Sequence, residues 1–493
     1  PKANIWIIPS VESPQVYRNY AQTSKVHLEM ARGEVEHIQL VFPSKVNEEY
    51  RFTFDRYLKG IQISARELKK MNGYYDALVP FKNQLKCTDT LTAVWITVQC
   101  PSRVPVGKYH QTIKIEGSKH FTIQLDYNVH HTTIPLKSSI PITVGVENRC
   151  MTECLNDKEA DKERQRWVDF VLSYRMTPVF GTQITPERWQ YEHSFSPWAW
   201  NDKRSIRLLN DRRYSCYMLP FFTLSENELA SLLCNIQKKG KLKESLFYIW
   251  DEPAYMEDYE QIKRKVNIIR KYASDARILT TFFCGPRNGP RKGDLYAVFD
   301  YLKHHIHVAT ISLAPCKGNE EEVQHIRYKV PEGIDWWSYV CWQPGGNEPN
   351  FLLQMKGIQQ RAIMWRTWKN GSQGFLYWNC NIYHKRNPFT YITDMPHGDG
   401  ILIYPGDILG CKGPIASARL ERWRDGAEEM ELLRLVEKNY SKEKADTLLN
   451  IVYSSPLSFI EKAHNIPFFR KELLDQLDKT IPIDYKLRIT DFI

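Results

Sequence analysis

Two adjacent carboxylates, Asp251 and Glu252, come directly after an apolar run of strand character over residues 246–250. Because neighbouring acids repel each other, one of them keeps its proton to a higher pH than usual. A protonated acid beside an ionised one suits general acid catalysis, in which the acid gives its proton to a leaving group. The alternative is an acidic loop that caps the next helix, since Glu257 and Asp258 lie near a helix start. The pair alone leaves both interpretations open.

From about residue 140, apolar strand-like runs alternate with helical patterns, which indicates repeated βα units around a parallel sheet. Eight repeats over roughly 250 residues predict a (β/α)₈ barrel, and no glycine-rich nucleotide loop follows the first strand. The eight expected strands are residues 141–146, 178–181, 216–222, 246–250, 277–283, 307–313, 336–342 and 374–379, with helical patterns at 159–174, 225–238, 257–273 and 353–369.

The fourth of these strands ends at the acid pair, and strand ends of a barrel open into the cleft that holds substrate. Adjacent strand residues point to opposite faces, so both acids reach a ligand only where the strand stops being regular. Pro253 favours such a break, because it lacks an N–H donor and restricts Glu252. We expect Glu252 to protonate a leaving group and Asp251 to hold or polarise a second group beside it.

The rest of the chain predicts a multidomain protein of β and α/β class. Residues 1–136 show short alternating runs separated by turn residues, which predicts an N-terminal β-sandwich domain. The barrel is expected over 137–437, with an extra strand near 398–406 and a helix from about 416 to 437. Residues 438–493 carry amphipathic patterns, so we expect a short helical tail packed on the barrel.

Composition narrows the classes of partner. The net charge of +10 is spread along the sequence without a nucleic-acid motif, so no nucleic-acid partner is expected. No segment reaches the roughly 20 apolar residues of a membrane span, so no transmembrane segment is expected. The 11 cysteines match no metal-ligand or redox spacing, and neither a metal nor a cofactor is predicted. We expect an exported protein (periplasmic, cell-surface or secreted) whose signal segment has been removed.

Aromatic residues gather at the last two predicted strands. Aromatics form 13% of the chain, and Trp and Tyr suit sugar rings because each has a flat apolar face and a polar edge. Aromatic stripes inside barrels are more often core, and Trp337 and Tyr339 have the stronger claim to that role. The expected substrate-binding residues, for a glycan or glycoconjugate, are Trp337, Tyr339, Trp342, Trp378, Asn379 and Tyr383.

The end of the seventh strand lacks a carboxylate. A retaining glycosidase with a protein nucleophile needs a second carboxylate about 5 Å from the acid. Here the strand ends in Cys341, Trp342 and Gln343, and the next carboxylate is Glu348 in the loop. The substrate's own 2-acetamido oxygen can serve instead, with a neighbouring Asp that orients the acetamide. A protein nucleophile, with Glu348 or Glu147 as candidate, remains an alternative.

Several segments together resemble glycoside hydrolase family 123 and its wider group of barrel proteins of unassigned function. They are residues 248–253 (YIWDEP), 336–341 (WWSYVC), 374–379 (GFLYWN), 398–406 (GDGILIYPG) and 417–428 (SARLERWRDGAE). Members with known activity are β-N-acetylgalactosaminidases that retain configuration through an oxazoline formed by the substrate's acetamide. The resemblance implies that Asp251 stabilises the acetamido group and that Glu252 acts first as acid and then as base.

Other interpretations stay open beside this one. The chain could be a glycosidase for a sugar without the acetamide, or a carbohydrate-binding barrel without turnover. In the last motif, Arg419, Arg422 and Glu428 have spacings that allow ion pairs along one helix face, which would anchor that helix to the barrel.

Overall fold

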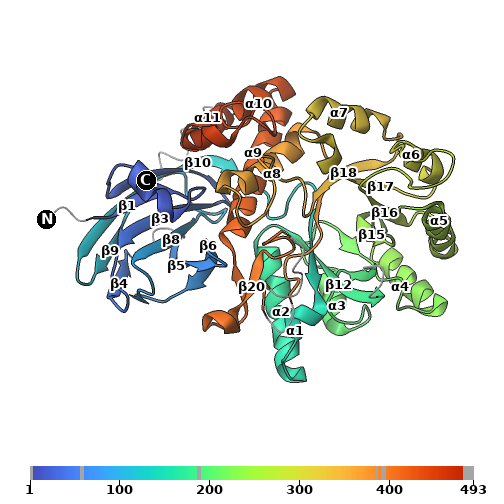
Figure 1. Cartoon of the computed structure of the whole chain (residues 1–493), viewed down its shortest axis with the longest axis horizontal. Helices are drawn as coiled ribbons and strands as arrows, with labels where there is room; N and C mark the ends of the chain where they lie inside the picture. The colour runs from blue at the N-terminus through green and yellow to red at the C-terminus, as the bar shows by residue number, and fades with distance from the viewer. Residues whose placement is uncertain (1–3, 56–59, 186–189, 384–386, 390–395, 481–493) are drawn as a thin grey trace.

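Two five-stranded β-sheets form the N-terminal part of the chain (Figure 1). The structure is a computed structural model that describes residues 4–55, 60–185, 190–383, 387–389 and 396–480. The sheets have the strand orders β1-β3-β8-β5-β6 and β2-β10-β9-β4-β7, and apolar side chains of both form one shared core. The strands are β1 (Trp6–Pro9), β2 (Lys25–Arg32), β3 (Val35–Pro43), β4 (Glu49–Phe54), β5 (Gln62–Met71), β6 (Tyr74–Pro80), β7 (Gln84–Lys86), β8 (Leu91–Gln99), β9 (Gly107–Glu116) and β10 (His120–Thr133).

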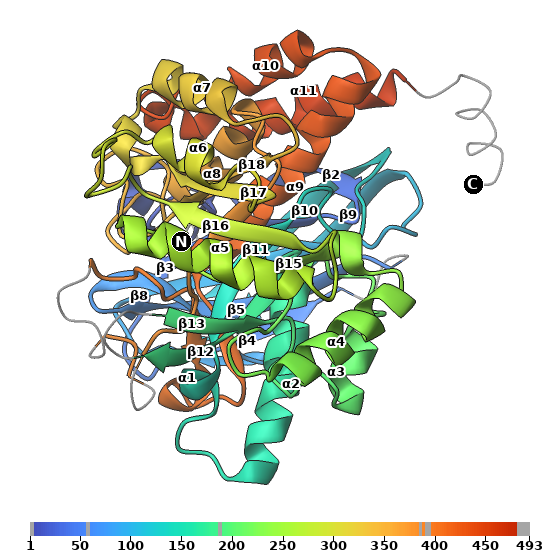
Figure 2. The same ribbon diagram turned by 90° about the vertical axis from the view of Figure 1, so that its right-hand side faces the viewer.

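A nine-stranded, nearly closed sheet forms the second part, with the order β13-β12-β11-β19-β18-β17-β16-β15-β14 (Figure 2). Eight strands are parallel and correspond to the eight predicted from the sequence. They are β11 (Ile142–Glu147), β12 (Thr177–Thr185), β14 (Tyr217–Met218), β15 (Ser245–Tyr248), β16 (Arg277–Phe282), β17 (Val308–Ser312), β18 (Asp335–Val340) and β19 (Phe375–Tyr377).

The ninth strand, β13 (Gln190–Ser194), was not expected. It pairs antiparallel with β12 and lies between β12 and β14, where the barrel would otherwise close. A backbone hydrogen bond from Phe195 N to Met218 O, 2.7 Å long, joins the end of β13 to β14. The prediction of eight parallel strands is therefore confirmed, and the closing strand is a correction to it.

Helices surround the barrel sheet, and several begin at side chains that satisfy free backbone N–H groups. Ser225 and Glu228 form such a capping box at the start of α4. The helices of this part are α1 (Asn148–Thr152), α2 (Asp157–Ser173), α3 (Lys203–Leu208), α4 (Glu226–Lys238), α5 (Met256–Arg270), α6 (Ala297–Leu302), α7 (Glu320–Lys329) and α8 (Gly357–Lys369). The expected strand after the barrel is β20 (Ile403–Pro405), which pairs with β21 (Pro414–Ala416).

The long helix α9 (Ala418–Asn439) lies between the barrel and the N-terminal sheets (Figure 1). Arg419, Arg422 and Glu428 do not pair with one another among the described contacts, so that prediction is wrong; the ion pair within α9 joins Arg424 and Glu421. Arg419 instead pairs with Asp76 of β6 at 2.9 Å, and the Glu428 carboxylate accepts the backbone N–H of Val35 at 3.1 Å. These polar side chains bind the helix to the N-terminal sheets because that face of α9 is buried against them.

The tail contains α10 (Lys442–Leu449) and α11 (Ile466–Asp478). Both helices contact α9, and α11 also contacts β2 and β10 of an N-terminal sheet. The tail therefore packs on the N-terminal part of the molecule as well as on the helix beside the barrel.

All eleven cysteines lie within the described residues and are free thiols, seven of them buried. No helix among the described residues is both long and apolar enough to cross a bilayer.

Candidate active site

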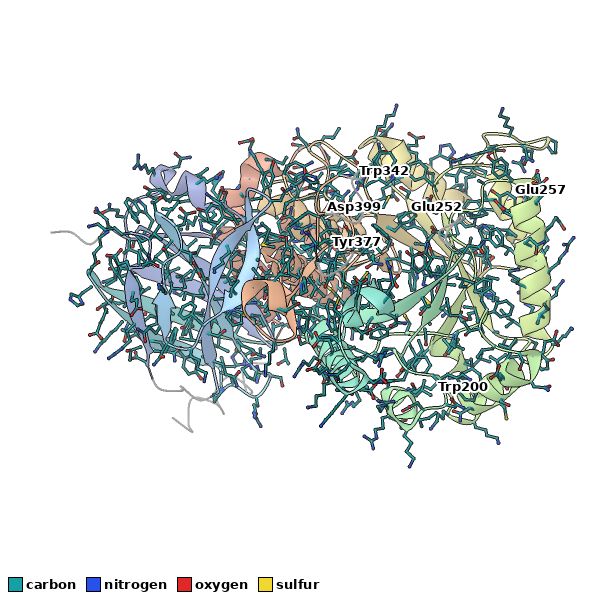
Figure 3. The ribbon with its side chains drawn as sticks, turned by 60° about the horizontal axis from the view of Figure 1, so that its bottom comes forward. Trp200, Glu252, Glu257, Trp342, Tyr377 and Asp399 are labelled. Carbon is teal, nitrogen blue, oxygen red and sulfur yellow. The ribbon has the colours of Figure 1, made fainter. Side chains whose placement is uncertain are left out.

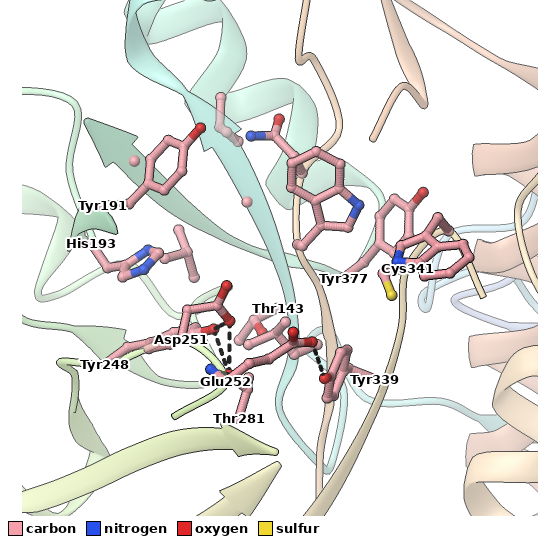
Figure 4. Close-up of a pocket in the computed structure, with 18 residues that line it drawn as sticks. Thr143, Tyr191, His193, Tyr248, Asp251, Glu252, Thr281, Tyr339, Cys341 and Tyr377 are labelled. Atoms are coloured by element: carbon pink, nitrogen blue, oxygen red, sulfur yellow. Dashed lines mark hydrogen bonds between the residues drawn. The ribbon is translucent and has the colours of Figure 1, made fainter. Parts of the chain in front are cut away.

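A cavity of about 490 Å³ opens at the carboxyl ends of the barrel strands (Figures 3 and 4). Strands β11, β12, β13, β15, β16, β18 and β19 contribute to its wall, together with the segment that follows β15. The lining residues include Thr143, Gly145, Tyr191, His193, Tyr248, Asp251, Glu252, Thr281, Tyr339, Cys341, Trp342, Tyr377, Trp378 and Asn379. The position agrees with the place where barrel enzymes hold their substrates.

Both adjacent acids face this cavity because strand β15 ends three residues before Asp251. Glu252 has a φ of 43°, in the left-handed region that glycine prefers. Its backbone N–H donates to the Thr281 hydroxyl at 2.9 Å, which holds the chain in this conformation. A non-glycine residue in this region carries backbone strain, which is often found at functional sites. The break expected before Pro253 is therefore present.

Two hydroxyl groups hold the Asp251 carboxylate. The Tyr248 hydroxyl donates to Oδ1 at 2.7 Å, and the Thr281 hydroxyl donates to the same oxygen at 2.8 Å. The residue is exposed at the wall of the cavity, where the surrounding protein removes part of the hydration of its carboxylate. This burial raises the pKa of Asp251, and the two hydroxyl donors oppose the rise. Since both donors bind Oδ1, Oδ2 is available to a ligand.

Glu252 has a different environment from its neighbour. Burial raises the pKa of Glu252 to about 7, and the negative charge of Asp251 adds to the rise. The Tyr339 hydroxyl donates to Glu252 Oε1, and this hydrogen bond and the positive charge of Arg287 both act to lower the pKa. Glu252 therefore carries its proton over much of the range up to neutral pH, as a general acid must.

Four of the expected substrate-binding residues line the cavity: Tyr339, Trp342, Trp378 and Asn379. Trp342 is 42% exposed at the cavity, which leaves a large aromatic surface free for a ligand. The Trp378 indole N–H donates to Asp399 Oδ1 at 3.0 Å, so the ring is fixed in position.

The other two expected binding residues lie elsewhere, and their assignment is corrected. Trp337 is 2% exposed and packs in the barrel core against Gly374. It shares a face of β18 with Tyr339 but lies one step deeper in the barrel. Tyr383 is fully buried in a separate apolar cluster with Ile382 and Tyr404.

Neither candidate protein nucleophile lines the cavity. Glu348 forms an ion pair with Arg366 at 3.1 Å in a buried position. Glu147 is buried at the end of β11, where its carboxylate accepts the backbone N–H of Arg149 at the start of α1. Among the described residues around the cavity, Asp251 and Glu252 are the only carboxylates.

Sequence reasoning missed several residues of the site. Tyr248 and Thr281 hold Asp251, and each lies near the end of its own strand, which is the signal that could have identified them. His193 comes from the unexpected strand β13 and stacks on Tyr248, with ring centroids 4.2 Å apart. Burial lowers the pKa of His193 to about 4, so this ring is neutral at physiological pH. Asp399 lies behind Trp378, and burial raises its pKa to about 6.

No cluster of three or more His, Cys, Asp or Glu side chains suited to a metal ion occurs within the part of the chain that the structure describes.

Comparison with known proteins places the chain in a family. The family model described as the glycoside hydrolase 123 catalytic domain matches residues 162–436, which include the acid pair. A family 123 glycoside hydrolase from Clostridium perfringens, studied for glycolipid glycan hydrolysis, has a similar structure with a TM-score of 0.67. The two sequences are 13% identical, and the alignment covers 100% of each chain.

Other solved structures match with TM-scores below 0.5. One is a GH5 xyloglucanase from Bacteroides ovatus, with 11% identity, 82% of this chain and 98% of that chain covered, and a TM-score of 0.25. Another is a GH2 β-galacturonidase from Eisenbergiella tayi, with 8% identity, coverage of 81% and 90%, and a TM-score of 0.34. A comparison with curated proteins finds no match. The family match covers more than half of the chain, and the protein therefore belongs to glycoside hydrolase family 123 and is a glycoside hydrolase.

Proposed function

We propose that the protein removes β-linked N-acetylhexosamine, with N-acetylgalactosamine as the preferred sugar, from a glycan or glycoconjugate with retention of configuration. The substrate's 2-acetamido group would serve as nucleophile. The observation that carries the proposal is the pair of adjacent acids with unlike surroundings in a cavity that offers no third carboxylate among its described lining residues.

In the first step, the acetamido oxygen attacks the anomeric carbon while the bond to the leaving-group oxygen breaks. Glu252 gives its proton to that oxygen, and an oxazoline forms. Asp251 Oδ2 accepts the acetamide N–H, which turns the carbonyl oxygen toward the anomeric carbon and stabilises the positive charge that develops. Tyr248 and Thr281 keep the Asp251 carboxylate in place for this role.

In the second step, the ionised Glu252 takes a proton from water as the water attacks the anomeric carbon. The oxazoline opens, the acetamide is restored, and Glu252 is protonated again. The sugar leaves with its original configuration because the anomeric carbon has been attacked twice. The family membership and the C. perfringens structure, with its glycolipid glycan hydrolysis, support a glycoconjugate as the substrate.

The test compares 4-nitrophenyl β-glycosides that carry a 2-acetamido group or a 2-hydroxyl group. We expect turnover of the acetamido sugar alone. Asp251→Asn should lower kcat by about 10²- to 10³-fold, the usual effect of removing one group that stabilises developing charge. Glu252→Gln should lower kcat by about 10²- to 10⁴-fold on alkyl glycosides, and by less on the 4-nitrophenyl glycoside, whose leaving group needs little protonation.

Glu257→Gln is the matched control, because Glu257 is a nearby carboxylate in the first turn of α5 that does not line the cavity (Figure 3). It should keep wild-type rates. Equal cleavage of the 2-hydroxyl sugar would refute substrate assistance, and a preference for N-acetylglucosamine would correct the sugar.

A further inference from the structure

A second cavity, of about 660 Å³, lies beside the catalytic one on the other side of strand β13. Its lining includes two tryptophans, Trp198 and Trp200, and the polar side chains of Asn148, Asn201, Asn227 and Ser231. Figure 3 shows Trp200 away from Glu252, close to the helices on the lower side of that view. We call this the Trp198–Trp200 cavity. Its volume falls within the range of about 300–1,000 Å³ that is typical of small-ligand sites.

Strand β13 is the wall between the two cavities. Successive side chains of a strand point to opposite faces. Tyr191 and His193 line the catalytic cavity, whereas Glu192 and Ser194 line the Trp198–Trp200 cavity. The second cavity is therefore a separate space, and a ligand there would not touch the acid pair.

The segment that carries the two indoles is held in place by polar contacts. The Ser196 and Ser205 hydroxyls lie 2.6 Å apart, and the Ser205 hydroxyl also bonds to Ala199 O at 2.7 Å. The Trp198 indole N–H donates to Asp161 at 3.2 Å, and the Arg204 guanidinium lies 4.5 Å from the ring centroid. Both tryptophans are half-buried against the core, so each has one side packed on protein. Arg204 covers part of the Trp198 ring, so Trp200 offers the freer aromatic face, and a ligand that contacts these positioned side chains loses little entropy by ordering them.

The charge of the lining selects against an anionic ligand. Among the described residues that line the cavity there is no lysine or arginine. Glu192 uses both oxygens on backbone N–H groups, those of Phe221 at 2.7 Å and Thr223 at 2.6 Å. Glu228 is engaged in the capping box of α4. Both carboxylates are thus occupied, which leaves uncharged amides and hydroxyls to meet a ligand.

The side-chain oxygen of one amide in the lining, Asn148, has no hydrogen-bond donor among the described residues. The Asn148 side chain donates to Thr182 at 3.0 Å, but its Oδ1 is buried and has no hydrogen-bond partner among the described residues. A buried acceptor without a donor is unfavourable, and a ligand hydroxyl could satisfy it.

From these observations we propose that the Trp198–Trp200 cavity is a second glycan-binding site, which takes a neutral oligosaccharide segment. Pyranose rings have apolar faces for the indoles and hydroxyls for the amides, and they carry no charge. The site goes beyond the proposed function: it binds without turnover and would hold the enzyme on a glycan-rich surface while the catalytic cavity works.

The test is a binding titration with a neutral tetrasaccharide that ends in β-linked N-acetylgalactosamine. The protein is the whole 493-residue chain with Glu252→Gln, and N-acetylgalactosamine is present in excess to fill the catalytic cavity. We expect binding to persist, and Trp200→Ala to weaken it by about tenfold or more, because truncation of a central aromatic anchor has effects of this size. Asn227→Ala removes an exposed amide, cannot disturb the core, and should weaken binding by a smaller factor.

Tyr328→Ala is the matched control, since Tyr328 is 87% exposed on α7, far along the chain from the cavity. It should leave the affinity unchanged. Unchanged affinity in both Trp200→Ala and Asn227→Ala would overturn the proposal, as would tighter binding of a sulfated tetrasaccharide. The titration does not require turnover, so failure of the proposed N-acetylgalactosaminidase activity appears separately, in the 4-nitrophenyl glycoside assay.

Discussion

At the scale of residues, two chemically similar acids one position apart have different surroundings. Asp251 receives two hydroxyl donors on one oxygen, which favour its ionised form. Burial and the negative charge of Asp251 favour the protonated form of Glu252, and the single hydroxyl donor, from Tyr339, does not outweigh them. The different pKa values of the two acids, on which their proposed roles depend, therefore come from their surroundings: Tyr248 and Thr281 at Asp251, and burial and the Asp251 charge at Glu252.

The pKa of Glu252 can be moved in either direction by single substitutions. Tyr339→Phe removes a donor that stabilises the ionised carboxylate, so the pKa of Glu252 should rise above its value of about 7. Asp251→Asn removes a negative charge, so the pKa should fall. In a pH profile of kcat/KM, the basic limb reports loss of the acid's proton. We expect this limb to move to higher pH in Tyr339→Phe and to lower pH in the residual activity of Asp251→Asn. Shifts in the same direction would show that another group controls the limb.

The acid pair could be predicted from sequence because all of its signal is local: an apolar strand, two acids and a proline. Trp337 and Tyr339 show where local reasoning stops. They alternate on the same face of β18, and sequence gives their face but not their depth in the barrel. Trp337 lies in the barrel core, whereas Tyr339 lines the cavity. Tyr248 and Thr281 meet at Asp251 from different strands, and that meeting depends on sheet register.

At the scale of elements, the site depends on close packing of strand ends. The eight parallel strands were predictable because buried strands are continuous apolar runs. Strand β13 was not, because its sequence, QYEHS, is polar, and it is stabilised by pairing with β12. The same strand supplies His193 to the catalytic cavity and Ser194 to the Trp198–Trp200 cavity.

Gly145 of β11 tests this close packing. A Cβ built at Gly145 would lie 1.9 Å from the backbone oxygen of Trp378 in the segment after β19. Because the clash is with backbone, no side-chain rotation relieves it. Gly145→Ala should therefore destabilise the fold by at least about 1–3 kcal/mol, as overpacking does. It should also lower kcat/KM, since Trp378 and Asn379 must move, and thermal unfolding and 4-nitrophenyl glycoside kinetics measure the two effects.

Gly345→Ala is the matched control for this prediction, because a Cβ there meets nothing within 4 Å and the residue has no positive φ. Its stability should equal or slightly exceed that of the wild type. If Gly145→Ala and Gly345→Ala had the same stability and the same kcat/KM, β11 and the segment after β19 would be able to move apart without cost.

At the scale of the whole molecule, buried ion pairs join the barrel, the N-terminal sheets and the tail. Arg470 of α11 pairs with Glu34 at 2.7 Å, and Arg361 of α8 pairs with Glu429 of α9 at 2.8 Å. Burying charges is costly, so such pairs add little net stability, but an unpaired buried charge is strongly unfavourable. Any other arrangement of the barrel, the N-terminal sheets and the tail would leave some of these buried charges unpaired, so the ion pairs favour the observed arrangement. The sequence showed these charges but not their partners, which lie up to several hundred residues away.

His130 gives this docking a measurable pH dependence. The ring is 2% exposed, with Nδ1 2.7 Å from Asp478 of α11 and Nε2 2.6 Å from Glu29 of β2. Burial alone would lower the pKa of His130, but the two carboxylates outweigh it and raise the pKa to about 9. Since the folded pKa lies above the unfolded value of 6.5, the stabilisation is complete below pH 6.5 and is lost as the pH rises through about 9.

Replacing His130 should remove that pH dependence. Burial alone would raise the pKa of Glu29, but hydrogen bonds from His130 and His27 lower it to about 2. The Glu29 carboxylate therefore stays ionised from pH 6.5 to pH 9. His130→Gln should lower the free energy of unfolding by about 2–4 kcal/mol at pH 6.5, because two carboxylates lose a charged partner. The loss should shrink toward pH 9, as chemical denaturation at several pH values would show. His110→Gln is the control, since His110 pairs with Asp126 at 2.6 Å in an exposed position and should change stability little. A pH-independent loss in His130→Gln would mean that packing, rather than charge, holds α11 on the sheet.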